Sequence, residues 1–282
     1  MLSALAFCVA LLSLTGNANA DEFDDAKAAF ERGFYGFTGE ITPLEGTVDI
    51  RYRPFSKARV EMTIDTVFGF KEGAERAAFV ADIGVDSSSG GIQWRAGFLG
   101  FGREDVDPNN IVVTWFYDSN ELGSELAVRQ KCLWEPRGER PCPAANPTKV
   151  VLDSLLKPRP NRPVSQNDVI YETNYEEFGW KGFLTNPNFS NQVPTARVKG
   201  ISSLGGRKVL VTEISGEATR EDGERRLLGT ITGYDAIDLQ TGISVQSAVR
   251  FHIEPYGEGT EKYSLDTIAT IVTVFDPPDL AR

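Results

Sequence analysis

Apolar and polar residues alternate along most of this chain, and the alternation predicts a protein built mainly from β-strands. The segment from Arg59 to Asp65 is the clearest case, because Val60, Met62 and Ile64 fall on one side and charged or polar residues fall on the other. A two-residue period gives a strand one apolar and one polar face, which is typical of a half-buried antiparallel strand.

The same period recurs to the end of the chain and predicts about eleven strands, several longer than the usual ~5–6 residues. Glycine-containing turns separate them, including Leu204-Gly205-Gly206, Asp222-Gly223 and Thr241-Gly242. Consecutive long hairpins predict a mainly β fold, either a large, strongly curved antiparallel meander or an incomplete barrel. The further predicted strands are Ala77–Val85, Gly91–Phe101, Asn110–Tyr117, Leu126–Trp134, Val169–Tyr175, Pro194–Ser203, Lys208–Ala218, Arg226–Asp235, Gly242–Glu254 and Lys262–Phe275.

One helix is predicted ahead of the strands, over Asp24–Arg32. Acidic residues stand in its first turn, Ala26, Ala29 and Phe30 mark one face, and Gly33 ends it. Few other segments have a helical period, so the predicted fold stays mainly β with one N-terminal helix.

The first twenty residues have the composition of a secretion signal. Residues 2–14 are almost wholly apolar, and Ala18-Asn19-Ala20 places small residues at both recognition positions before a cut. This apolar run is too short to span a bilayer, and no later run is long enough for a spanning helix. We therefore expect removal of residues 1–20, a mature chain from Asp21, a periplasmic or secreted location and no stable membrane span.

A proline-rich stretch, residues 157–163, is the sharpest change in composition after the signal. Its prolines alternate with basic and polar residues, which predicts an extended, exposed polyproline spacer. The spacer would divide the mature chain into residues 21–156, with the helix and the first β half, and residues 164–282, the second β half. One sheet that continues across both halves is the alternative.

The formal net charge of −11 limits the choice of partners. An acidic protein is repelled by nucleic-acid phosphates, so no nucleic-acid partner is expected. The acidic stretch Asp105–Asn110 resembles a calcium loop, but Asn110 and Phe116 stand where that loop needs glycine and glutamate. Neither a metal site nor a cofactor is predicted.

Two cysteines, Cys132 and Cys142, remain after removal of the signal. In an oxidising compartment an even pair this close in sequence is typical of a disulfide, and Pro136, Gly138 and Pro141 allow the chain between them to turn back. A redox or metal-binding pair is the alternative, but the spacing is not C-x-x-C and no histidine lies nearby. We predict a structural disulfide.

An aromatic cluster with interleaved acids is the best candidate binding site. Aromatic faces beside carboxylates hold sugars, and paired carboxylates can hydrolyse a glycosidic bond. Packing of these aromatic side chains in the core and at its rim is the alternative. The predicted ligand-binding residues are Tyr171, Tyr175, Phe178 and Trp180, and the interleaved acids are Glu172, Glu176 and Glu177.

The only histidine, His252, is predicted on the polar face of a strand, together with Arg250 and Glu254 and opposite Phe251. Catalysis by an imidazole needs an orienting carboxylate and a nucleophile within hydrogen-bond reach. No such partner is expected beside His252, and the chain has no G-x-S-x-G nucleophile motif. No catalytic residue is predicted.

The C-terminal half, from Val198 to Ile253, resembles the long-hairpin sheets of LolA/LppX-type periplasmic proteins. The resemblance rests on Asp238-Leu239-Gln240-Thr241-Gly242, a D-x-x-T-G step between two strands. In that family an open curved sheet, often closed by a helix, shelters an acyl chain on its concave side. The resemblance implies a ligand-sheltering sheet, with Asp24–Arg32 as a candidate lid, and it transfers no site residues.

We expect a non-enzymatic protein of the cell envelope that binds an apolar ligand, such as a lipid, or an envelope protein. A hydrolase of envelope carbohydrate is the second hypothesis, and it requires two carboxylates about 5–10 Å apart in one cleft. A pure protein-interaction module is the third. An apolar concave face too wide to be filled by its own side chains would favour the first hypothesis over the third.

Overall fold

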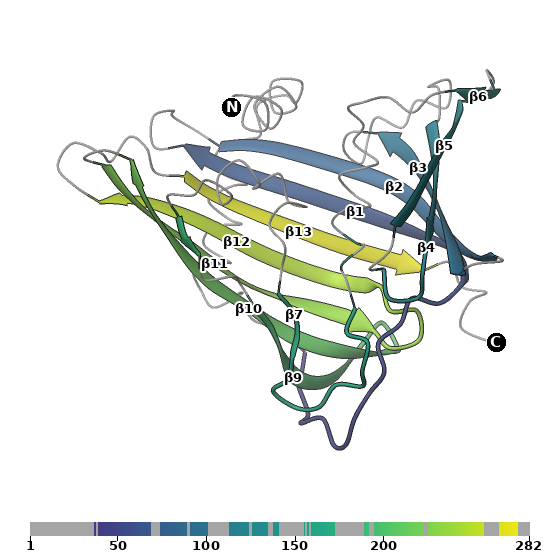
Figure 1. The fold of residues 1–282 in the computed structure, drawn as a ribbon, viewed down its shortest axis with the longest axis horizontal. Helices are drawn as coiled ribbons and strands as arrows, with labels where there is room; N and C mark the ends of the chain where they lie inside the picture. The colour runs from purple at the N-terminus through teal and green to yellow at the C-terminus, as the bar shows by residue number, and fades with distance from the viewer. Residues whose placement is uncertain are drawn as a thin grey trace.

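The computed structural model contains a single large β-sheet (Figure 1), with thirteen strands among the described residues. The structure describes residues 37, 39–68, 74–88, 91–100, 113–123, 126–134, 138–140, 155, 157, 159–172, 189–191, 195–222, 225–256 and 265–275. The strands are β1 (Phe55–Phe68), β2 (Ala74–Ser88), β3 (Gly91–Gly100), β4 (Val113–Ser119), β5 (Leu126–Trp134), β6 (Gly138–Arg140), β7 (Val169–Glu172), β8 (Phe189–Asn191), β9 (Thr195–Leu204), β10 (Arg207–Asp222), β11 (Arg225–Asp238), β12 (Ser244–Tyr256) and β13 (Leu265–Phe275).

The strands follow one another across the sheet in the order β6-β5-β4-β3-β2-β1-β13-β12-β11-β10-β9-β7, and β8 pairs with β10. Most strands therefore pair with their neighbours in sequence, as in a meander. β1 and β13 are the main exception, since they pair antiparallel from Ala58 opposite Phe275 to Phe68 opposite Leu265. This pairing joins residues before and after the proline-rich stretch in one sheet. The division of the chain into two domains stays a prediction.

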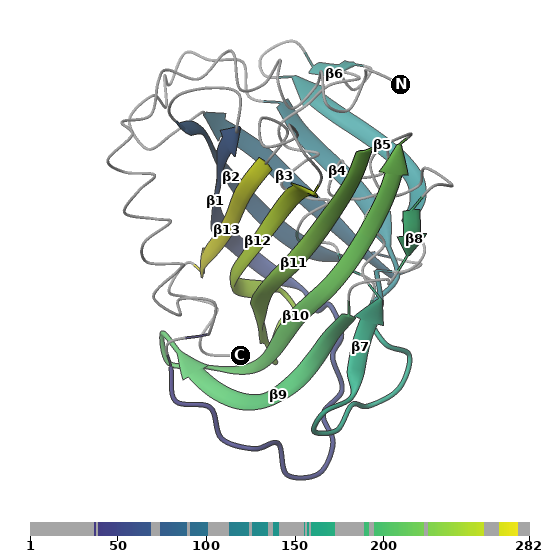
Figure 2. The same cartoon turned by 90° about the vertical axis from the view of Figure 1, so that its left-hand side faces the viewer.

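The predicted fold class is confirmed as a large, strongly curved antiparallel sheet. Both Figure 1 and Figure 2 show long strands that bend and twist together. Within the described residues the edge strands β6 and β7 are not paired with each other, so the sheet is open. The predicted strand Leu126–Trp134 has the same bounds as β5, whereas the three-residue β6 and β8 were not predicted, because so short a segment shows no period.

Side chains on the two faces of the sheet have different surroundings. The sheet curls toward the same side at its β4–β5 end and its β9–β7 end, which makes one face concave (Figure 1). Two clusters of buried apolar side chains lie on the concave face, one including Trp94 and Met62 and the other including Phe251. A third cluster, which includes Tyr234 and Phe37, lies on the convex face.

The predicted turn at Leu204-Gly205-Gly206 is confirmed. Gly205 and Gly206 have φ angles of 58° and 79°, and they close the β9–β10 hairpin with Leu204 opposite Arg207. Positive φ at both central residues is the requirement of a type I′ turn, which glycine meets at the lowest cost.

Several predicted features lie outside the described residues. They are the signal (residues 1–20), the helix Asp24–Arg32 and the acidic stretch Asp105–Asn110, and each stays a prediction. In the part of the chain that the structure describes, no helix has the length and hydropathy needed to cross a bilayer.

Candidate functional site

A line of apolar residues crosses the concave face from strand to strand. Ile64, Ala269, Val249, Gly233 and Ile214 stand opposite one another on β1, β13, β12, β11 and β10, and we call these five residues the apolar row. Ile64, Ala269 and Val249 are only partly buried, although they lie between two buried clusters. The row therefore leaves apolar surface accessible in the middle of the concave face.

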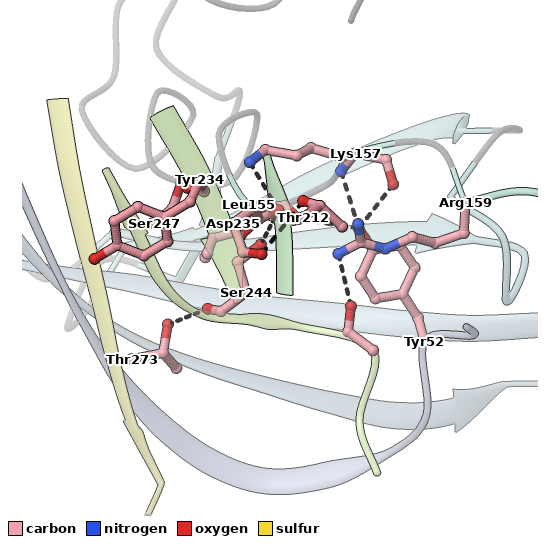
Figure 3. Close-up of polar contacts among 11 residues, drawn as sticks. Tyr52, Leu155, Lys157, Arg159, Thr212, Tyr234, Asp235, Ser244, Ser247 and Thr273 are labelled. Carbon is pink, nitrogen blue, oxygen red and sulfur yellow. Dashed lines mark hydrogen bonds and ion pairs between the residues drawn. The ribbon is translucent and has the colours of Figure 1, made fainter. Parts of the chain in front are cut away.

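Two residues further along β12, β11 and β10, the concave face becomes polar, whereas β1 and β13 continue with the buried apolar residues Met62 and Ile271. Ser247, Asp235 and Thr212 stand opposite one another there and are buried. Lys157 Nζ donates a hydrogen bond to Asp235 Oδ2 at 3.1 Å, and Ser244 Oγ donates to the same oxygen at 3.0 Å (Figure 3). We call Lys157, Asp235 and Ser244 the buried clamp, since Lys157 and Asp235 have side chains only 3% and 0% exposed.

A strap, meaning the described residues between Leu155 and Val164, carries Lys157 to the concave face. The Tyr52 hydroxyl accepts a hydrogen bond from the Lys157 backbone nitrogen at 2.9 Å and lies 3.0 Å from the Leu155 carbonyl oxygen. The Arg159 guanidinium lies 4.9 Å from the centre of the Tyr52 ring and donates to the Gly242 carbonyl oxygen at 2.7 Å (Figure 3).

The prediction of an exposed spacer is therefore wrong for Lys157 and Arg159. Both residues are buried, because their cationic ends reach acceptors on β11 and on the turn that follows it. Residues 161–163 are exposed, so only the end of the stretch has the predicted environment.

The D-x-x-T-G step forms a turn that its own polar groups fix. Asp238 Oδ2 accepts hydrogen bonds from the Thr241 backbone nitrogen at 2.9 Å, from the Thr241 hydroxyl at 2.6 Å and from Arg207 at 2.9 Å. Gly242 has a φ of 77°, and a Cβ there would stand 2.2 Å from the Arg51 carbonyl oxygen. The motif is explained by the turn alone.

The convex face has an open hollow of about 550 Å³ over β10, β11 and β12. Six of its eight lining residues are polar, and the other two are Ile214 and Gly233 of the apolar row. The polar lining residues are Glu213, Ser215, Thr230, Thr232, Arg250 and His252.

His252 lies among polar residues on the opposite face of its strand from Phe251, as predicted; it lines the convex hollow, and Phe251 is buried in a concave-face cluster. The expectation that no carboxylate lies nearby is wrong. His252 Nδ1 lies 3.6 Å from Asp266 Oδ2, and Arg250 Nε donates to Asp266 Oδ1 at 2.7 Å. Asp266 stands directly opposite His252 on β13, a pairing set by strand register that no local motif signals.

Among the described residues, two titratable groups have clearly shifted pKa values. Burial, and to a lesser extent the charge of Asp235, raises the pKa of Tyr234 to about 12; its ring packs edge-on against Phe37 with centroids 6.0 Å apart. A hydrogen bond from Arg162 lowers the pKa of Asp168. Tyr234 is therefore protonated and Asp168 ionised at neutral pH, so neither is suited to proton transfer there.

The predicted aromatic site is described only at its start. The backbone of Tyr171 lies in β7 and pairs with Ala196 on β9. The other predicted ligand-binding residues and two of the three acids lie outside the described residues, so the site stays a prediction; these are Tyr175, Phe178, Trp180, Glu176 and Glu177.

The predicted reversal of the chain after Cys132 is confirmed, because β5 and β6 form a hairpin with Cys132 opposite Arg140. Cys142 lies outside the described residues, and the disulfide stays a prediction. Within the described residues, no three His, Cys, Asp or Glu side chains gather in a way that could hold a metal ion.

No protein-family model matches the sequence, and no match was found among curated proteins. Among solved structures, the chain is similar to a DUF1329 family protein from Desulfovibrio piger, with 11% identity, a TM-score of 0.27 and coverage of 79% of this chain and 86% of that chain. It is also similar to a putative outer membrane lipoprotein-sorting protein domain from Vibrio parahaemolyticus, with 10% identity, a TM-score of 0.21 and coverage of 90% and 95%. Both likenesses are too distant to transfer a site or a function.

Proposed function

We propose that the protein binds an apolar ligand of the acyl-chain class on the concave face of its sheet, in the cell envelope outside the cytoplasm. The accessible apolar row is the observation that carries the proposal. Ile64, Ala269 and Val249 are partly buried beside apolar residues that are fully buried. Removal of apolar surface from water stabilises a complex by about 25 cal/mol per Å², so this strip favours an elongated apolar ligand.

The buried clamp favours a ligand that lies along the apolar row, next to the clamp and not across it. A chain that crossed Asp235 would have to displace Lys157 from a buried ion pair, and an uncompensated buried charge costs several kcal/mol. The small residues Ala269 and Gly233 lie between branched residues in the row, so the side chains there extend less far from the sheet. The buried clamp thus sets one edge of the proposed binding surface.

The untested predictions fit this function. We propose Tyr171, Tyr175, Phe178 and Trp180 as further ligand contacts, and export by residues 1–20 would bring the protein to the lipids of the envelope. The alternative of a carbohydrate hydrolase stays a hypothesis.

The test compares one aromatic substitution on each face of β13. Ala269→Phe fills the apolar row, whereas Val274→Phe adds the same ring where the side chain is 59% exposed on the convex face. We expect lipid to co-purify with the wild type and with Val274→Phe in native mass spectrometry, and a fluorescent fatty acid to bind both. We expect Ala269→Phe to lose roughly tenfold or more in affinity, which is about 1.4 kcal/mol.

A second variant protects the test against misfolding. Val249→Ser makes the row more polar without adding volume, and its melting curve reports whether the fold is kept. Equal binding by all variants, or no lipid on the wild type, would refute the proposal. Co-purification of an envelope protein in place of lipid would favour the interaction-module hypothesis.

A further inference from the structure

The hollow on the convex face includes Ile214 and Gly233 of the apolar row in its lining, but its polar side chains lie on the opposite side of the sheet, and the inference drawn from them does not rest on the proposed function. Its volume of about 550 Å³ falls in the range of small-molecule sites, about 300–1,000 Å³. Its lining comes from three adjacent strands, so it is part of the rigid framework and not of a loop.

The charged groups of the hollow are compensated in pairs. Arg250 forms a two-point contact with Asp266, through Nε at 2.7 Å and through Nη2. Glu213 pairs with Lys199 at 2.6 Å, on the neighbouring β9. An anionic or a cationic ligand would have to compete with one of these pairs, so net charge is not the property that the hollow selects.

The remaining polar lining consists of groups that exchange neutral hydrogen bonds. Ser215, Thr230 and Thr232 contribute hydroxyls, each of which donates one hydrogen bond and accepts others. The imidazole of His252 stands directly opposite Thr230 on the adjacent strand.

We infer that this hollow binds a small, neutral, polyhydroxylated compound of the sugar or polyol class. Such a ligand offers several hydroxyls that both donate and accept, which matches the lining, and it brings no charge that would disturb the Arg250–Asp266 and Glu213–Lys199 pairs. A single ligand hydrogen bond to a neutral side chain contributes little, because it replaces a hydrogen bond to water, so binding depends on several of them together.

His252 provides a direct readout, because it is the only histidine in the chain and its ring signals in an NMR spectrum need no assignment. We would titrate the full chain with a panel of neutral hexoses and hexitols and, separately, with inorganic phosphate. The expected result is a saturable shift of the His252 signals with at least one neutral compound and none with phosphate.

Variants test whether the hydroxyls make the contact. Thr232→Val should weaken binding of the responding compound by roughly tenfold, about 1.4 kcal/mol, and Thr232→Ser should restore it. Thr47→Val, on an exposed residue outside the hollow, is the matched control and should bind as the wild type does.

Three results would overturn the inference. They are no shift with any neutral compound, a shift with phosphate alone, and equal affinity of Thr232→Val and wild type. Loss of fatty-acid binding in the Ala269→Phe variant leaves this site unaffected, so the two proposals fail separately.

Discussion

Two ion pairs on opposite faces of the sheet are held in different ways. On the concave face, Lys157 and Asp235 are 3% and 0% exposed and lie 78 residues apart in the sequence. On the convex face, Arg250 and Asp266 are 16% and 11% exposed and stand 16 residues apart on adjacent strands. One pair depends on a segment that crosses the sheet, and the other on the register of a hairpin.

This difference bears on the energetics of each pair. Desolvation of a fully buried ion pair costs several kcal/mol, which its Coulomb attraction and hydrogen bonds must offset. The partly exposed pair has a smaller cost and a smaller gain, because water screens it. We therefore expect removal of one member to be severe for Lys157–Asp235 and milder for Arg250–Asp266.

The largest effect is expected for Lys157→Met, which keeps most of the side-chain length but removes the ammonium beside Asp235. The free energy of unfolding should fall by about 3–5 kcal/mol, because a buried carboxylate loses its cation. Urea unfolding followed by circular dichroism measures this loss.

Two further variants sharpen that result. The double variant Lys157→Met with Asp235→Asn should recover at least half of the loss, since a neutral amide keeps a contact with Ser244. Lys57→Met is the matched control: Lys57 pairs with Asp82 at 2.8 Å but is 48% exposed, so its loss should stay within about 0.5 kcal/mol. Equal losses of unfolding free energy in Lys57→Met and Lys157→Met would contradict the proposed difference between buried and exposed ion pairs.

An intermediate effect is expected for Tyr234 on the convex face, and it depends on pH. The pKa of Tyr234 is about 12 in the folded chain and 10.0 ordinarily, so between these values the unfolded chain loses the phenol proton first. Stability linked to this group is present below pH 10 and lost as pH rises toward 12, by roughly 2 kcal/mol.

The variant Tyr234→Phe lacks this ionisation. Its stability relative to wild type should therefore rise across that pH window, as measured by urea unfolding at a series of pH values. A difference between the two proteins that does not change with pH would contradict the burial of Tyr234 beneath Phe37.

The smallest effect is expected for Asp266→Asn. Arg250 loses an ionic partner in a pair that is more exposed than Lys157–Asp235, so the free energy of unfolding should fall by less, by about 1 kcal/mol. Thermal unfolding at neutral pH checks this value. A loss as large as that of Lys157→Met would show that the convex pair is buried as deeply as the clamp.

Most of the fold could be predicted from the sequence, because alternation reports directly on the two faces of a strand. Val60 and Met62, predicted on the apolar side, are buried on the concave face. The short strands β6 and β8 could not be predicted, since three residues are too few to show a period.

The contacts that build the candidate sites were less predictable. Neither the contact of His252 with Asp266 nor the alignment of Ile64 with Ala269 follows from local composition, because each requires the strand register. The burial of Lys157 was missed for a different reason. A lysine among prolines has the composition of an exposed spacer, and its acceptor lies on a distant strand.

The pairing of β1 with β13 sets a condition on how the chain folds. The other long strands form hairpins with their sequence neighbours and can assemble locally, whereas the contact of Thr66 with Thr267 spans 201 residues. Until β13 is in place, β1 and β12 are long edges with unpaired backbone groups, which readily pair with other chains. Non-local pairing of this kind slows folding. The partly folded chain can therefore aggregate through these edges until β13, near the C-terminus, pairs with both β1 and β12.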